Sequence, residues 1–240
     1  MDIAGATHTG KIRSNNEDSY LICDHNGLFL LIVADGMGGS NAGEVASRVA
    51  VNTIRDSFLT RSGDISEFLV HSVCNANKMI LQQASDEVDK MGMGTTVDAV
   101  VIDKDKVYIA HVGDSRVYHY SGGVLSQVTV DHSYVQELID NGLLTSEEAE
   151  SHPQKNLITR VLGGGEKTYA DIIMRDWKPD DILLLCSDGL TNQVNNDEIK
   201  EIISRKGKAA TKAEAMIRLA NKRGGRDNIT VIIAQNREES

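Results

Sequence analysis

The chain has 240 residues, of which 40% are hydrophobic and 25% are charged, as in an ordinary globular protein. Its formal net charge of −10 argues against broad binding to nucleic acid, because neutralising phosphates needs a basic surface. No stretch approaches the length of about 20 apolar residues that a membrane-spanning helix needs, and the N-terminus lacks a basic-then-apolar signal. We therefore expect a cytoplasmic chain with no membrane segment.

We expect residues 1–240 to form a single domain. The chain has two prolines and no low-complexity segment, so nothing in it reads as a linker. A chain of this length buries about 70% of its unfolded surface, which is enough for a sizeable core. Cys23, Cys74 and Cys186 are odd in number and lie among apolar neighbours, which favours buried, reduced thiols over disulfides.

The first third of the chain predicts strands followed by a pair of helices. Short apolar runs bounded by turn residues predict strands over residues 2–8, 20–23 and 28–34. Apolar residues at helical spacing then predict one helix through Phe58, which Ser40 or Asn41 would cap, and a second helix after Asp64. Because these helices form a consecutive pair rather than alternating with single strands, the pattern argues against a doubly wound parallel sheet.

Strands return after this helix pair. Apolar runs predict them over residues 95–102, 106–113, 116–120, 124–128, 170–176, 181–187 and 229–234. A second helix pair is predicted over 196–204 and 209–222. The expected fold class is α+β, with a central β-sandwich of two antiparallel sheets flanked by helix pairs in α-β-β-α layers.

Residues 133–165 differ from the predicted strands around them. Short helical pieces occur there, one of them opened by a capping box from Thr145 to Glu148. His152 and Pro153 break the pattern, and three glycines at 163–165 end it. We interpret this segment as a mobile flap beside the sandwich that shapes substrate choice.

Acidic residues recur at the ends of the predicted buried strands. They are Asp35, Asp114, Asp188 and Asp227. Two carboxylates about 5 Å apart repel by roughly 3 kcal/mol at an effective dielectric constant of about 20. If the strand ends converge, cations must lie between the acids, and oxygen ligands favour Mg²⁺ or Mn²⁺ over Zn²⁺. A hairpin turn is the simpler interpretation of one Asp-Gly pair, but a glycine-rich loop and a helix follow Asp35.

The loop that begins at Gly36 does not match the known nucleotide-binding loops. It lacks the Gly-Lys-Ser/Thr of a P-loop, and Asn41 stands where Gly-x-Gly-x-x-Gly needs its last glycine. The chain also contains no EF-hand spacing and no recognisable nucleophile elbow. These exclusions leave a cation site as the best interpretation of the acids.

Seven short motifs occur in order along nearly the whole chain: Arg13-x-x-Asn16-Glu17-Asp18, Asp35-Gly36-Met37-Gly38-Gly39, Gly94-Thr95-Thr96, His111-Val112-Gly113-Asp114-Ser115-Arg116, Asp131-His132, Ser187-Asp188-Gly189 and Gly225-x-Asp227-Asn228. Each motif is weak alone, but the ordered set resembles the metal-dependent serine/threonine protein phosphatases of the 2C type, especially their compact bacterial members. The fold of that family, a β-sandwich flanked by helix pairs, agrees with the fold expected above.

The resemblance implies a role for each acid. Asp35 would bridge two metal ions, and Asp188 and Asp227 would complete the protein ligands of the first ion. The Gly36 carbonyl would bind the second ion. Two side chains would reach the waters of that second ion, namely Glu17 and Asp18. Asp114 resembles the family's ligand for a weaker third ion, shared with Asp188.

The resemblance also implies which residues bind the substrate phosphate and protonate the leaving group. Arg13 would clamp the substrate phosphate, since its planar fork donates two hydrogen bonds where lysine offers a point charge. The amides of Asn16 and Asn228 would support the ligands. Some relatives carry a histidine after Asp-Gly as general acid, but Met37 cannot donate a proton. A metal-bound water or His132 would take that role, and His132 could equally be a structural histidine held by Asp131.

The implied function is metal-dependent hydrolysis of phosphoserine and phosphothreonine on proteins. Two Mn²⁺ or Mg²⁺ ions, with a weaker third, would hold a bridging hydroxide that attacks phosphorus in line, so no protein nucleophile is needed. The expected partners are phosphorylated proteins, such as a serine/threonine kinase and its substrates, and we expect a monomer. Two alternatives stay open. One is a catalytically silent, phosphoprotein-binding regulatory module of the same fold, which the costly retained carboxylates disfavour. The other is a phosphatase for small molecules.

Overall fold

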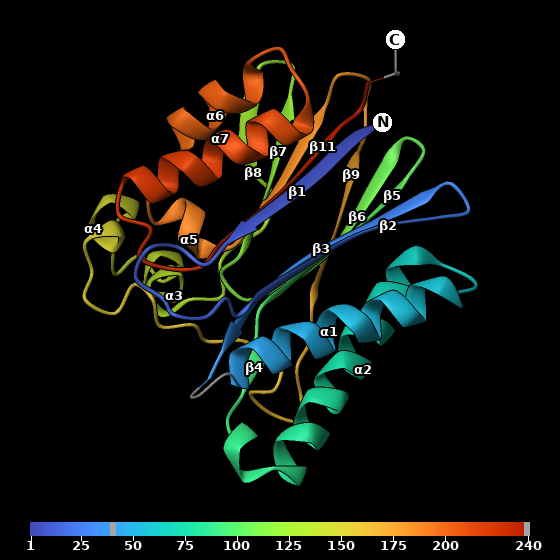
Figure 1. The fold of residues 1–240 in the computed structure, drawn as a ribbon, viewed down its shortest axis with the longest axis vertical. Helices are drawn as coiled ribbons and strands as arrows, with labels where there is room; N and C mark the ends of the chain where they lie inside the picture. The colour runs from blue at the N-terminus through green and yellow to red at the C-terminus, as the bar shows by residue number, and fades with distance from the viewer. Residues whose placement is uncertain (39–41, 238–240) are drawn as a thin grey trace.

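Two antiparallel β-sheets lie face to face between two pairs of helices in the computed structural model of the protein, which describes residues 1–38 and 42–237 (Figure 1). This arrangement confirms the α-β-β-α layers expected from the sequence. The expected caps of the first helix, Ser40 and Asn41, lie outside the described residues. No described helix combines the length and the apolar character needed to cross a membrane.

One sheet brings the two ends of the chain together. Its strand order is β1 (Asp2–His8), β11 (Ile229–Gln235), β10 (Ile182–Cys186), β7 (Arg116–Ser121) and β8 (Val124–Gln127). Helices α6 (Asn196–Ser204) and α7 (Ala209–Lys222) cover the outer face of this sheet (Figure 1). Both helices have the bounds that the sequence predicts. They follow α5 (Asp188–Thr191), a short helix that the sequence analysis did not predict.

The other sheet carries the first helix pair. Its strand order is β2 (Asp18–His25), β3 (Leu28–Met37), β5 (Val97–Asp103), β6 (Lys106–Val112) and β9 (Asp171–Asp176), with the short β4 (Gly94–Thr95) paired to the end of β3. Helices α1 (Ala42–Leu59) and α2 (Ile65–Asp86) cover its outer face, and the 3₁₀ helix η1 (Val88–Lys90) follows (Figure 1).

The alternation of side chains along β3 explains why the layers stack. Leu30 and Ile32 point into the core beneath α1 and α2, whereas Leu31 and Val33 point into the core between the two sheets. All four are fully buried, and each contributes about 1.5–3 kcal/mol relative to an exposed side chain. A third core lies between the other sheet and helices α6 and α7. A strand that is apolar on both faces thus requires cover on both sides.

Local capping signals place the helix starts. Helix α2 begins after Asp64, as predicted, and Asp64 caps it by accepting a hydrogen bond from the Glu67 amide at 3.0 Å. The predicted capping box of Thr145 and Glu148 opens α4 (Ser146–Glu150). The three cysteines are free thiols; Cys186 is buried, whereas the other two are only half-buried.

Strand β3 is longer than predicted. The sequence predicted an end at Ala34, but the strand continues through Asp35 and Gly36 because Gly36 and Met37 pair with β4. Asp35 therefore lies within regular sheet and not in the glycine-rich loop. Its backbone is held by hydrogen bonds to Thr96, which fixes the direction of its side chain.

The flap segment is anchored at both ends. Helix α3 (Tyr134–Asp140) begins next to a bridge between Ser133 and Ile158. Near the other end, Leu162 is fully buried and pairs with Thr95. The Asn77 side chain of α2 bonds the backbone of Gly163 and Gly165, at 2.7 and 2.9 Å. Between these anchors, α4 lies at the periphery of the molecule (Figure 1).

Candidate metal centre

Five aspartates converge at one end of the sandwich. Asp18 and Asp35 are direct register partners on β2 and β3. Asp114 follows β6, Asp188 opens α5 directly after β10, and Asp227 lies two residues before β11. Burial raises the pKa of Asp35 well above its usual value, and the charges of the other four aspartates raise it further. The predicted acids therefore meet in space.

The cluster cannot hold all of its negative charges without a counter-charge. Burial is the largest cause of a raised pKa for Asp18, to about 7, for Asp114, to about 8, and for Asp188, to about 6. Neighbouring carboxylates add to each shift, and a hydrogen bond with Asp35 offsets part of the shift of Asp188. Each group resists ionisation because water is excluded and like charges are close.

Two buried carboxylate oxygens in the cluster have no hydrogen-bond partner among the described residues. These atoms are Oδ1 of Asp18 and Oδ1 of Asp114. The other oxygen of Asp18, Oδ2, accepts hydrogen bonds from Ser187 Oγ at 2.8 Å and Thr230 Oγ1 at 2.6 Å. Leaving buried carboxylate oxygens unpaired is costly, so the site fits a cation. Its donors are all oxygen atoms, which suits Mg²⁺ or Mn²⁺.

The side chains do not complete a ligand set by themselves. Within residues 1–38 and 42–237, no three acidic, histidine or cysteine side chains form a group able to hold a metal ion. Backbone carbonyls and water would have to complete the coordination, as the role expected for the Gly36 carbonyl requires. Asp227 also has only part of its carboxylate available to a metal ion, because its Oδ2 accepts a hydrogen bond from Arg13 Nη2 at 2.8 Å.

Gly36 lies where no other residue fits. A Cβ atom at this position would lie 2.1 Å from the Gly43 carbonyl oxygen and 2.6 Å from that of Glu17. The first turn of α1 and the loop before β2 therefore press directly on β3. This packing brings Glu17 to the edge of the cluster, where burial raises the pKa of its carboxyl group.

Asparagine amides join the N-terminal loop to the cluster. Asn228 Oδ1 accepts the Glu17 amide at 2.8 Å, and its Nδ2 donates to the carbonyls of Thr9 and Asn15 at 3.0 and 2.8 Å. Asn16 donates to Thr7 Oγ1 at 2.9 Å and accepts the Asp18 amide at 3.3 Å. The two amides therefore hold the loop that carries Arg13.

Sequence reasoning missed several hydroxyl and amide contacts to the acids. Besides Ser187 and Thr230, Asn192 Nδ2 donates to Asp188 Oδ2 at 2.9 Å, and Thr96 Oγ1 accepts the Asp35 amide at 2.9 Å. Ser187 and Thr96 belong to the quoted motifs, so a signal existed for them. Thr230 and Asn192 carry no local signal, because only the folding of separate segments brings them to the acids.

His132 is held by a partner other than the one expected. Its Nδ1 accepts the Gly113 amide at 2.9 Å, and its Nε2 lies 2.8 Å from Arg160 Nη1 and 3.2 Å from Asp171 Oδ2. Burial is the main reason that the pKa of His132 falls to about 4, and the ring is neutral at pH 7. Asp131 instead binds Arg116 through both carboxylate oxygens. The expectation that Asp131 holds His132 was wrong.

His111 is a core residue whose two ring nitrogens both have hydrogen-bond partners. It is fully buried, its Nδ1 lies 2.7 Å from Asp98 Oδ1, and its Nε2 lies 2.9 Å from the Val130 carbonyl oxygen. Its ring lies against that of His132, with the centroids 4.6 Å apart. These contacts tie β5 and β6 to the start of the flap.

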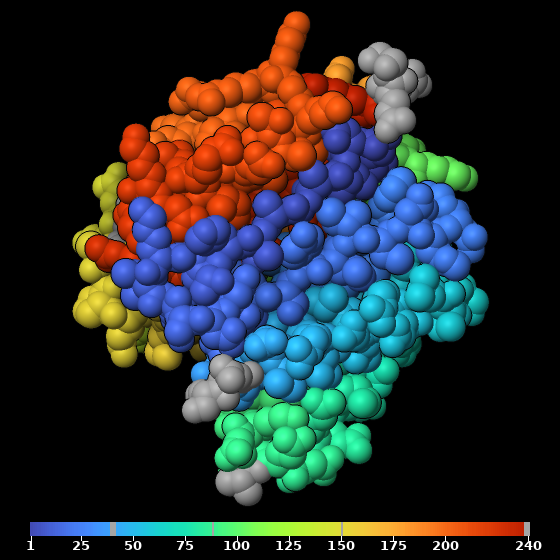
Figure 2. Space-filling view, viewed as in Figure 1, coloured from blue at the N-terminus to red at the C-terminus, as the bar shows by residue number. Residues whose placement is uncertain are grey.

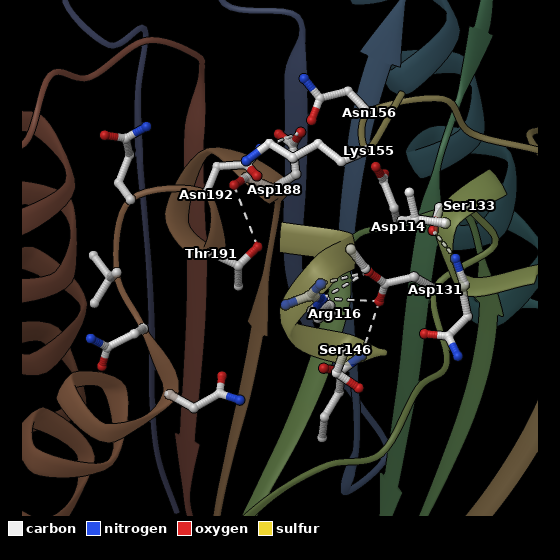
Figure 3. A pocket seen from close by; sticks show the side chains of 18 of the residues that line it. Asp114, Arg116, Asp131, Ser133, Ser146, Lys155, Asn156, Asp188, Thr191 and Asn192 are labelled. Carbon is white, nitrogen blue, oxygen red and sulfur yellow. Dashed lines mark hydrogen bonds and ion pairs between the residues drawn. The ribbon is translucent and has the colours of Figure 1, made fainter. Parts of the chain in front are cut away.

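A cleft of about 580 Å³ opens beside the acids, between the flap and the segment that follows α5 (Figure 3). Asp188 and Asn192 lie on one side of it, and Asp114, Asp131 and Arg116 lie on the other. Its walls are rich in side-chain amides, from Gln127, Gln136, Asn156, Asn192, Gln193, Asn195 and Asn196. Amides can both donate and accept hydrogen bonds, so this surface suits a peptide backbone.

Comparisons with known proteins agree with this geometry. The protein phosphatase 2C family matches residues 4–230. The serine/threonine phosphatase stp of Listeria monocytogenes is 41% identical over 235 residues, which cover 95% of this chain and 93% of the relative. The crystal structure of the Mycobacterium tuberculosis serine/threonine phosphatase PstP/Ppp is 38% identical, with a TM-score of 0.91 and 98% of each chain covered. A structure of the PstP catalytic domain in complex with two manganese ions is 37% identical, with a TM-score of 0.88, and the match covers 97% of this chain and 96% of that one.

Proposed function

Because the chain belongs to the protein phosphatase 2C family and is a metal-dependent serine/threonine protein phosphatase, we propose that the five-aspartate cluster is its metal centre and active site. The observation that carries the proposal is the pair of buried, unpartnered oxygens on Asp18 and Asp114 among carboxylates that resist ionisation. A fold that keeps such costly groups together needs a cation to compensate for them.

The metal ligands of this chain would be those that the motifs mark. Asp35, Asp188 and Asp227 would hold the first ion, and the Gly36 carbonyl would hold a second beside Asp35. Glu17 and Asp18 would bind water on that second ion. Asp114 and Asp188 would hold a third, weaker ion. Either Mn²⁺ or Mg²⁺ suits this oxygen donor set, and when bound the ions supply the positive charge that polarises the phosphoryl group and activates water.

The residues around the cluster would orient the substrate. Arg13 is half exposed, with 51% of its side chain accessible, and it lies at the mouth of the centre. Its guanidinium would turn from Asp227 to the substrate phosphate and donate two parallel hydrogen bonds. Asn228 would keep the Arg13 loop in place through its bonds to Thr9, Asn15 and Glu17.

We also propose that residues 1–240 act as one catalytic domain, as a monomer, on phosphoserine and phosphothreonine segments of cytoplasmic proteins. A serine/threonine kinase and the targets of that kinase would be natural substrates. The amide-rich cleft beside Asp114 and Asp188 supports a polypeptide substrate, because an extended chain could bond its backbone there.

Phosphate release from a phosphothreonine peptide, measured with manganese and with chelator, tests the assignment. We expect release only with the metal, and a loss of about a hundred- to a thousandfold in Asp35→Asn and Asp188→Asn, by analogy with removing one electrostatic group from a preorganised site. Asp24→Asn is the matched control, because Asp24 is exposed on the same strand as Asp18. Wild-type rates in Asp35→Asn would overturn the assignment.

A further inference from the structure

One segment of this acidic protein is strongly basic. Residues 205–226 contain eight lysine or arginine residues and a single acidic residue, Glu214, whereas the whole chain has a formal net charge of −10. Lys212 is buried, but the other basic residues of the segment are exposed, namely Arg205, Lys206, Lys208, Arg218, Lys222, Arg223 and Arg226. These cations therefore form a positive surface that runs from the loop before α7, along α7, to the loop after it.

The C-terminal end of this surface adjoins the metal centre. The loop after α7 leads directly to Asp227 and then to β11. The N-terminal loop that carries Lys11 and Arg13 lies against it, and the Lys11 amide donates to the Gly225 carbonyl at 2.7 Å. Figures 1 and 2 show these two segments, blue and red, side by side on one face of the molecule. The positive surface thus reaches the phosphate-binding arginine.

Two glycines lock these loops together. Gly10 has φ +83°, and a Cβ atom there would lie 2.2 Å from the Asp227 carbonyl oxygen and 2.7 Å from that of Gly225. Gly225 has φ +53°, and its Cβ would lie 3.3 Å from Lys11 Cγ. Only glycine permits both the left-handed backbone and the close approach. The backbone that carries Lys11 and Arg226 is consequently held in place beside the site.

Three cations on the N-terminal loop, at the end of α7 and in the loop after α7 have no ion-pair partner within the described part of the chain. They are Lys11, Lys222 and Arg226, which we call the basic rim. The neighbouring arginines are engaged, since Arg13 binds Asp227 and Arg223 binds Glu198. Exposed, unpaired cations contribute little to the stability of a fold, so the rim is available to a ligand.

We propose that the basic rim binds acidic side chains, or a second phosphate group, that flank the target residue of a phosphoprotein substrate. The inference rests on the proposed function, in which Arg13 and the metal centre take the target phosphate. A protein partner fits better than nucleic acid or a lipid surface, because the rim is small, the chain is acidic overall, and the rim adjoins the site that hydrolyses the phosphate. The preferred substrate class is thus an acidic or multiply phosphorylated segment.

The test compares three phosphothreonine peptides of equal length whose flanking residues are neutral, glutamate or a second phosphoserine. In low salt, we expect kcat/KM to be about tenfold higher for the two acidic peptides than for the neutral one, and the ratio to approach one in high salt. In the triple variant Lys11→Gln, Lys222→Gln, Arg226→Gln, the ratio should fall to about one at low salt as well.

A matched triple variant removes the same charge elsewhere. Lys78→Gln, Lys104→Gln and Arg175→Gln lie on α2, on the β5–β6 turn and on β9, and all three residues are exposed. This control should keep the wild-type ratio. A wild-type ratio of one, or a ratio that persists in the rim variant, would overturn the proposal.

The outcomes separate this inference from the proposed function. If the wild-type enzyme releases phosphate from the neutral peptide but shows no acidic preference, the rim proposal fails and the proposed function stands. If no peptide is hydrolysed with manganese, the proposed function itself fails. Rim-dependent binding to vesicles that contain anionic lipid, combined with a peptide ratio of one, would assign the rim to a membrane surface and so contradict the proposal.

Discussion

Arg13 Nη2 lies 2.8 Å from Asp227 Oδ2, although the two residues are 214 positions apart in the sequence. The hydrogen bond to Asp227 is the largest reason that the pKa of Arg13 is raised. The arginine that we propose binds phosphate thus contacts a carboxylate of the proposed metal centre. In the proposed function, substrate phosphate would compete with this carboxylate for the same guanidinium, so phosphate binding would depend on the position and charge of Asp227.

Replacing Arg13 should weaken phosphate binding more than it weakens metal binding. Hydrogen bonds to charged groups contribute about 1.5–3 kcal/mol, so Arg13→Ala should lower kcat/KM by about 10- to 150-fold, mostly through KM. Arg13→Lys should recover little, because an ammonium group cannot donate two parallel bonds. Steady-state kinetics on a phosphopeptide check this. Arg48→Ala, on the exposed face of α1, serves as the control, and an unchanged KM in Arg13→Ala would contradict the role.

Neutralising Asp35 should stabilise the metal-free protein. The folded-state pKa of Asp35 is raised. Its contribution to the stability of the fold is therefore complete below about pH 4, where the carboxyl group is protonated in both states, and is lost as the pH rises through the folded-state pKa. In chelator, the Tm of the wild type should fall as the pH rises through the raised pKa values of the cluster, which include about 6 for Asp188, about 7 for Asp18 and about 8 for Asp114, and the Tm of Asp35→Asn should fall less. Saturating manganese should raise the wild-type Tm by about 5 °C and the variant's by less. Equal pH slopes in chelator would be evidence against the crowded cluster.

The two hydroxyls that hold Asp18 should tune metal affinity. Ser187 and Thr230 both donate to Asp18 Oδ2, so the double variant Ser187→Ala, Thr230→Val frees this carboxylate to move. Partners of this kind typically change metal affinity by about 10- to 100-fold. We expect a higher manganese concentration for half-maximal rate and little change in kcat at saturation. Ser57→Ala, which removes only a helix hydroxyl, is the control, and an unaltered manganese requirement in the double variant would exclude the role.

The middle of the flap should affect peptide substrates more than small ones. Replacing residues 143–157 with a short Gly-Ser linker leaves the anchors at Ser133, Asn77 and Leu162 in place. Because this segment borders the amide-rich cleft, kcat/KM for a phosphopeptide should fall by about tenfold or more, while hydrolysis of an aryl phosphate should change little. Equal losses on both substrates would show that the segment is structural.

Lys212 should make the free energy of unfolding increase with pH in the alkaline range. The side chain is 3% exposed, and its Nζ donates to the Ile203 carbonyl and to Gln235 Oε1, both at 2.6 Å. Burial lowers the pKa of this lysine to about 8, below its unfolded value near 10.5. The unfolded chain therefore binds more protons between these values, and stability should increase with pH across that window. Urea unfolding of the wild type and Lys212→Met at about pH 7.5 and about pH 9.5 checks this, since the variant should lack this part of the slope.

The helices and caps that depend on residues close in the sequence could be predicted. Helices α6 and α7 have the predicted bounds, α2 begins after Asp64 as predicted, and the predicted capping box of Thr145 opens α4. Periodicity and capping act over three or four residues, so the local sequence carries the information. The extension of β3 past Ala34 was missed because it depends on pairing with β4, some 60 residues away.

The metal centre likewise has residues that the sequence predicted and contacts that only the structure revealed. From the sequence alone, strand-end aspartates and ordered motifs marked Asp35, Asp114, Asp188 and Asp227 as candidates, because a carboxylate after a buried strand is a local feature. Only the tertiary structure decided that Asp18 faces Asp35, that Arg13 pairs with Asp227, and that His132 faces Asp171 rather than its neighbour in the chain. Such contacts depend on strand register and sheet packing, which join segments that no local pattern relates.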